Sequence, residues 1–221
     1  MCISKRKSVR IVFVMTILAF FGMQAVLLIK GINEKIFPQV EQMAKAEASN
    51  AATQIILRAV NTIEVNPSEC FRLTRDEQGE ITDVSYDTFQ LNQILSDCLS
   101  AAQSSLNAAS SGKVDPNTRM VYYDRGIIYS VHLGYFTGIA LFSQMGPQID
   151  VHMQVLGFCS GKIEVKSTPY GINSTLVEID LLMNTELLVI TPFLLSQAPV
   201  EVKIPLVIQI VHGKLPEYLL D

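Results

Sequence analysis

The sequence predicts an α+β fold in which an N-terminal transmembrane helix precedes amphipathic helices packed on a mostly antiparallel sheet. An uncharged apolar run lies near the start. Residues 39–63 and 87–109 repeat apolar side chains at helical spacing, and the C-terminal half alternates apolar and polar residues as half-buried strands do. We expect three parts: a basic cytoplasmic tail at 1–10, an anchor at 11–30 and a single extracytoplasmic domain at 31–221.

The apolar run extends from Ile11 to Ile29 and reads IVFVMTILAFFGMQAVLLI. As a helix it would be about 28 Å long, close to the roughly 30 Å of a bilayer's hydrocarbon core. Four basic residues precede it and only Lys30 follows closely, so the positive-inside rule places the N-terminus in the cytoplasm. The run is longer than a usual signal-peptide core. We therefore expect a single-pass protein of the cell membrane that contacts the lipid bilayer through residues 11–29.

The charge distribution argues against nucleic acid as the main partner. All 21 acidic residues but only 12 of the 17 basic residues follow Lys30, which gives the exported part a net charge of −9. A polyanion would be repelled by this charge. We expect instead a protein partner or self-association in the extracytoplasmic space, and no nucleic acid.

Two segments have the apolar spacing of helices. The repeated face of residues 39–63 is mostly alanine, which indicates a helix that lets its neighbour approach closely, either in the core or in self-association beside the membrane. In residues 87–109 the apolar face carries larger side chains than alanine. Asp87 and Gln90 form a variant of the capping box at the start of this segment.

Shorter elements lie around these helices. Residues 70–75 and 80–86 predict a hairpin, and residues 119–133 predict two extended stretches around a tight turn at 124–126. Residues 134–145 predict a short helix that ends at a Gly-Pro pair.

Four alternating stretches predict a sheet that is buried on one face: residues 151–155, 163–165, 177–189 and 202–210. Turn signals at 160–161 and 169–171 favour antiparallel neighbours. In the third stretch we expect Glu178, Asp180 and Glu186 to be exposed and these residues to be buried: Val177, Ile179, Leu181, Met183, Leu187 and Val189. In the fourth we expect one shared face: Val202, Ile204, Leu206, Ile208 and Ile210. Pro205 lacks a donor, so this strand is an edge or carries a bulge.

No known catalytic or metal-binding motif is present. His132, His152 and His212 lie far apart in predicted strands or strand ends, which is typical of structural histidines. The sequence has no Gly-x-Ser-x-Gly elbow, phosphate loop, His-Glu-x-x-His or Cys-x-x-Cys. We therefore predict no catalytic, cofactor-binding or metal residues, no cofactor, and a protein that is not an enzyme.

Three cysteines follow the apolar run: Cys70, Cys98 and Cys159. Three cysteines cannot all pair, and their spacing matches no zinc pattern, so we expect ordinary thiols. In an oxidising compartment, two of the three can still form one disulfide.

Several glycine-marked segments of the C-terminal half resemble one protein family. They are Leu133-Gly134, Thr137-Gly138, Gly146-Pro147, Gly171 to Ile179, Pro192-Phe193, Ile204-Pro205-Leu206 and Gly213 to Pro216. In this order they resemble the YunB family of sporulation proteins from endospore-forming bacteria. Residues 88–95 and the basic, then apolar, N-terminus also fit the resemblance.

The resemblance implies a role in spore formation in the mother cell, with the anchor in a mother-cell-derived membrane and the domain in the space between the two membranes around the forespore. It supplies no catalytic residues. We expect a membrane-anchored protein with a non-catalytic assembly or binding role.

Two other functions stay open. A lipid or apolar-ligand carrier would need the sheet and helices to open into a groove. An extracytoplasmic hydrolase would need a cleft that gathers distant polar groups, such as His132 or His152 with a carboxylate.

Overall fold

The computed structural model describes residues 15–17, 19–24, 30, 32–75, 81–171 and 174–212. The chain divides into two compact units, residues 1–43 with 131–148 and residues 44–130 with 149–221. The helices and antiparallel strands confirm the α+β class.

The predicted anchor is described only in part. Residues 15–17 and 19–24 are helical, and the rest of residues 11–29 lies outside the described residues, as does the tail at 1–10. No helix within the described ranges is long and apolar enough to span a bilayer. The division into tail, anchor and one domain stays a prediction.

The described α-helices are α2 (Phe37–Val60), α3 (Pro67–Cys70) and α4 (Thr88–Ser110). A π-helical turn, η1 (Ile32–Ile36), leads directly into α2. Asp87 caps α4 as predicted, because its Oδ1 accepts hydrogen bonds from the backbone N–H groups of Phe89 and Gln90 at 3.1 and 3.2 Å. The backbone N–H of Asp87 itself donates to the carbonyl of Cys70 at 3.0 Å.

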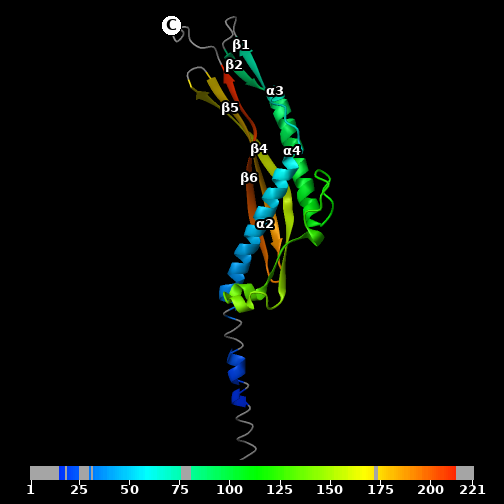
Figure 1. Ribbon diagram of the computed structural model, residues 1–221, viewed down its shortest axis with the longest axis vertical. Helices are drawn as coiled ribbons and strands as arrows, with labels where there is room; N and C mark the ends of the chain where they lie inside the picture. The colour runs from blue at the N-terminus through cyan, green and yellow to red at the C-terminus, as the bar shows by residue number, and fades with distance from the viewer. Residues whose placement is uncertain are drawn as a thin grey trace, which may run out of the picture. The chain divides into compact units, whose positions relative to one another are not determined.

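Two sheets are present among the described residues (Figure 1). β1 (Phe71–Arg75) and β2 (Ile81–Tyr86) form the predicted antiparallel hairpin. The larger sheet has the order β3-β4-β5-β6, with bounds Ile127–His132, Gln148–Tyr170, Ser174–Ile190 and Leu195–His212. β4, β5 and β6 are antiparallel neighbours joined in chain order.

β4 is one long strand where the sequence predicted two strands and a turn at 160–161. Leu156 pairs with Glu186 and Ser160 pairs with Asn184, so residues 157–159 form a bulge opposite Thr185. Gly157 supplies a positive φ of 81° at this point. The chain bulges here and does not reverse. The turn predicted at 169–171 is confirmed, since β5 begins at Ser174 after Gly171.

β6 reverses its inward face part-way along. Ile179 pairs with Val207 while the next residue of β5, Asp180, pairs with Pro205, so Leu206 is extra. Beyond this bulge Val207 and Val211 are buried, whereas Ile208 is 63% exposed. The predicted shared face of 202–210 is therefore wrong after Ile204. The predicted bulge and edge position of this strand are confirmed.

Two further predictions of local structure are wrong. Residues 134–145 contain short 3₁₀ turns, η3 (Leu133–Thr137) and η4 (Ala140–Phe142), in place of one helix. Of the two extended stretches expected within 119–133, only β3 is a strand, and it follows the predicted tight turn, η2 (Asp124–Gly126).

α4 and the part of α2 from Ala44 onward cover one face of the large sheet and form its main core (Figure 1). Five alanines of these helices are fully buried: Ala48, Ala52, Ala59, Ala102 and Ala109. Alanine at these positions lets backbones approach closely, as predicted for the small-residue face. Leu181, predicted to be buried, is fully buried with its inward neighbours on β5. A smaller core joins the β1–β2 hairpin to the other end of the sheet.

Candidate functional site

The face of the large sheet opposite the helices is polar and carries two close ion pairs. Lys162 Nζ lies 2.8 Å from Glu164 Oε1, and Lys203 Nζ lies 2.8 Å from Asp180 Oδ2. The hydrogen bond and charge of Lys162 lower the pKa of the Glu164 carboxyl, and Asp180 raises the pKa of Lys203 in the same way. These pairs give the face charges of both signs.

Asp180 departs from the sequence prediction, which expected it to be exposed. It is only 6% exposed. β5 is a central strand, and Asp180 lies between Glu164 of β4 and Pro205 of β6 in register. Long side chains of neighbouring strands, Lys203 above all, cover it. Glu186, also predicted to be exposed, is exposed.

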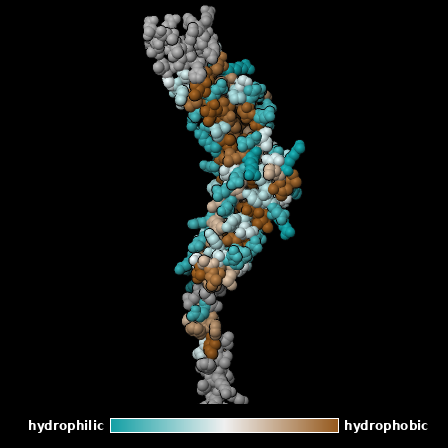
Figure 2. All heavy atoms as spheres, in the orientation of Figure 1, coloured by the Kyte–Doolittle hydropathy of each residue, from teal (hydrophilic) through white to brown (hydrophobic). Residues whose placement is uncertain are grey.

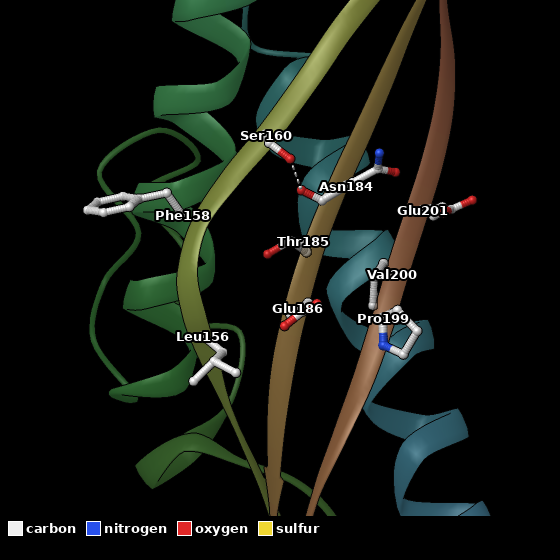
Figure 3. A pocket seen from close by; sticks show the side chains of 9 residues that line it. All are labelled: Leu156, Phe158, Ser160, Asn184, Thr185, Glu186, Pro199, Val200 and Glu201. Carbon is white, nitrogen blue, oxygen red and sulfur yellow. Dashed lines mark hydrogen bonds between the residues drawn. The ribbon is translucent and has the colours of Figure 1, made fainter.

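A depression of about 330 Å³ lies at the β4 bulge. Figure 3 shows that its lining comes from three strands: Leu156, Phe158 and Ser160 of β4, Asn184, Thr185 and Glu186 of β5, and Pro199, Val200 and Glu201 of β6. In this view the Phe158 ring points away from β5.

The bulge that shapes the depression is fixed by α4. The backbone N–H of Cys159 donates to Oε1 of Gln103 on α4 at 2.7 Å. On the other side of the bulge, the Ser160 hydroxyl donates to the backbone carbonyl of Asn184 at 3.3 Å. The Gln103 side chain of α4 thus provides the acceptor for the backbone N–H of Cys159 in the bulge. The neighbouring Phe158 is 86% exposed.

The chemistry of the depression is that of a contact surface. Its polar groups are the carboxylates of Glu186 and Glu201, the Asn184 amide and the hydroxyls of Ser160 and Thr185. Apart from the buried Thr185 hydroxyl, these groups can accept hydrogen bonds from a cationic or extended ligand. Within the residues that the structure describes, no three His, Cys, Asp or Glu side chains are placed to bind a metal ion.

The histidines have separate surroundings. His152 is partly buried, and its Nδ1 lies 3.1 Å from the backbone carbonyl of Gly126, which binds the ring to the turn before β3. His132 is partly buried at the end of β3. The side chain of His212 lies outside the described residues.

The described cysteines are free thiols: Cys70, Cys98 and Cys159. Burial and the nearby Asp97 raise the pKa of Cys98 to about 11. Burial likewise raises the pKa of Cys70 and of Cys159. Thiols with raised pKa values are poor nucleophiles at neutral pH, so these side chains pack as small apolar groups.

Sequence reasoning missed a buried polar cluster around Asp115. This carboxylate is fully buried between α4 and the following loop. It accepts hydrogen bonds from the hydroxyls of Ser105 (2.8 Å), Thr118 (2.6 Å) and Tyr122 (3.2 Å) and from the backbone N–H groups of Asn117 and Thr118. The Asp-Pro-Asn-Thr order, typical of an Asx turn, was the available signal. The cluster holds the loop against α4.

Comparison with known proteins shows a similarity to one family. Residues 128–218 match the model of the family described as sporulation protein YunB. The chain is also 25% identical over 202 residues to sporulation protein YunB of Bacillus subtilis (strain 168), over 90% of this chain and 78% of that protein. Both comparisons thus show a similarity to the YunB family. No solved structure matches it.

The YunB match places the family's characteristic region on the large sheet. It begins one residue into β3 and runs through β6. It therefore contains the polar face, the depression at the bulge, and the turns η3 and η4. The resemblance predicted from the glycine-marked segments is confirmed.

Proposed function

We propose that this protein is a membrane-anchored sporulation protein with a non-catalytic assembly or binding role in the extracytoplasmic space around the forespore. The observation that carries the proposal is the match of residues 128–218, the large sheet, to a family of sporulation proteins. The name of the Bacillus subtilis relative points to the same process.

The membrane anchor is supported by the sequence and by the helix that follows. Residues 11–29 are uncharged and follow four basic residues. The π-turn η1 and α2 then form continuous helical structure from Ile32 to Val60. A helix entering the domain directly from a membrane span would hold the domain close to the bilayer surface.

The packed core favours assembly over carriage of an apolar ligand. The large side chains between the sheet and the helices include Ile55, Leu106, Met153, Leu181 and Leu187, and each is at most 2% exposed. These side chains are closely packed, whereas a carrier needs a cavity of several hundred Å³. Binding would then occur on the exposed surfaces of the protein.

The hydrolase alternative would need a histidine paired with a carboxylate. The Nδ1 of His152 contacts a backbone carbonyl instead. We expect replacement of His132, His152 or His212 by Gln, one at a time, to leave the number of heat-resistant spores unchanged. A replacement that eliminates spores while the protein accumulates normally would support the hydrolase and contradict the assembly role.

Topology provides the test of the anchor. A reporter enzyme active only outside the cytoplasm, fused after Asp221, should be active in whole cells. The same fusion with residues 1–30 deleted is the matched control and should be inactive. Activity only of a cytoplasmic reporter at the same site would contradict the proposal.

A further inference from the structure

The segment from Leu133 to Met145 exposes apolar side chains without any charge among them. No charged residue or histidine lies between His132 and Asp150. Five large side chains of the segment have exposed fractions from 40% to 79%: Tyr135, Ile139, Leu141, Phe142 and Met145. Figure 2 shows apolar surface in this part of the molecule. An uncharged apolar patch of this kind marks a contact site.

The segment is folded, so its side chains are held outward. The backbone N–H of Leu133 donates to the carbonyl of Pro147 at 3.0 Å, and that of Gly134 donates to Met145 at 2.9 Å. These bonds close the segment into a loop built from η3 and η4. Gly134 has no room for a side chain, because a Cβ there would overlap the backbone carbonyl oxygens of Phe142 and Met145.

The segment belongs to the same compact unit as the residues that follow the apolar run. That unit contains residues 1–43 and 131–148. Figure 1 shows the turns η3 and η4 beside the start of α2. The apolar run ends at Ile29, and η1 begins at Ile32. Only two residues therefore separate the run from η1, which lies in the same compact unit as the segment.

We propose that residues 133–145 form a second membrane contact, which inserts its apolar side chains into the interface of the bilayer that residues 11–29 cross. This inference rests on the proposed anchor. Tyr favours the level of the lipid headgroups, and Phe and Leu favour the apolar side of this layer. A segment without charges enters the layer without desolvating an ion. Its backbone is irregular, which the hydrated interface tolerates and the hydrocarbon core does not.

The second contact would fix the orientation of the domain on the membrane. A single helix leaves a domain free to rotate about the helix axis, whereas a second contact point removes that freedom.

Single tryptophans test the inference, because the chain contains none. Full-length Leu141→Trp is reconstituted in vesicles of phosphatidylcholine and phosphatidylglycerol, with or without bromine on the acyl chains. Phe20→Trp reports on the anchor, and Phe158→Trp, 86% exposed at the β4 bulge, is the matched control. Melting curves from circular dichroism check that each variant folds, and Tyr135→Trp replaces Leu141→Trp if that variant does not.

We expect the brominated lipid to quench the emission strongly at positions 20 and 141 and little at position 158. Quenching at 20 without quenching at 141 would overturn the second contact and leave the anchor intact. Quenching at neither would overturn the anchor and the inference with it. Equal quenching at position 158 would show that the whole chain adsorbs to the membrane. An emission at position 141 that shifts to the blue as more protein is added per vesicle, without quenching, would show contact with a second copy. Both outcomes overturn the assignment.

Discussion

The two loops on either side of the β3 strand differ in which side chains they bury: the first buries a charged group, and the second exposes apolar ones. Residues 111–123 are mostly polar in sequence, yet the loop sends Asp115 into a fully buried position. Residues 133–145 are mostly apolar, yet they expose Leu141 and its neighbours. Composition alone would assign the first loop to solvent and the second to the core.

The difference teaches where function is to be sought. The buried Asp115 has five hydrogen-bond donors of its own chain around its carboxylate, so its needs are met within the fold. The exposed apolar side chains of 133–145 have no such internal cover. A stability role is expected for the first loop and a contact role for the second.

The largest effect on stability is expected from Asp115→Ala. It leaves several buried donors, among them the Ser105 and Thr118 hydroxyls, without an acceptor, which should reduce the free energy of unfolding by about 3 kcal/mol. Asp124→Ala, an exposed acid in the same region, is the control and should change it by less than about 0.5 kcal/mol. Denaturant unfolding of both proteins measures this. Equal effects would show that the polar loop does not hold the fold.

The apolar loop should depend on Gly134. Gly134→Ala places a Cβ against backbone carbonyl oxygens that cannot move independently, so we expect a loss of about 2 kcal/mol and faster amide exchange in residues 133–147. Gly138→Asn is the matched control, because Gly138 has open space around it and Asn tolerates its φ of 72°. Exchange that is unchanged in Gly134→Ala would show that the loop is not held as described.

The polar loop should also make stability depend on pH. Burial alone would raise the pKa of Asp115, but hydrogen bonds from Thr118, Ser105 and the backbone outweigh it and lower the pKa below its ordinary value of 3.8. The charged form is thus favoured by folding, so the stabilisation is complete above the unfolded pKa and is lost as pH falls through the lower folded pKa. The stability difference between the wild type and Asp115→Asn should shrink from about pH 6 to about pH 3. A difference that grows would contradict the sign of the shift.

The smallest effect concerns the thiols. With a pKa of about 11 and no exposure, Cys98 should not react with a thiol reagent in the native protein at neutral pH. The partly exposed Cys159 should react faster, and mass spectrometry of labelled peptides distinguishes the two. Rapid labelling of Cys98 would show that the core beneath α4 opens easily.

Features set by short-range pattern could be predicted from the sequence. The alanine face of α2, the Asp87 cap and the alternation along β5 follow from spacing within a few residues. The bulge in β4 could not be predicted, because it depends on Gln103, which lies 56 residues away in the chain. The burial of Asp180 likewise depends on Lys203 of the next strand.

The contact surfaces were predicted least well. A run such as 133–145 has the composition of a core helix, and only the tertiary structure shows that it faces outward. The reversal of β6 after Pro205 exposes Ile208 for a similar reason, since one extra residue in a strand exchanges its two faces. The alternation of apolar and polar residues does not reveal where a strand carries an extra, unpaired residue.

The central claim is that the exposed apolar loop makes a contact on which sporulation depends. The most direct measurement counts heat-resistant spores from cells whose only copy of the protein carries Leu141→Asp, beside cells with Phe89→Asp, an exposed position on α4. We predict that both proteins accumulate normally in the membrane fraction and that only Leu141→Asp reduces spore numbers, by about tenfold or more, since a carboxylate would enter the apolar contact. Wild-type spore numbers from Leu141→Asp cells would contradict the claim.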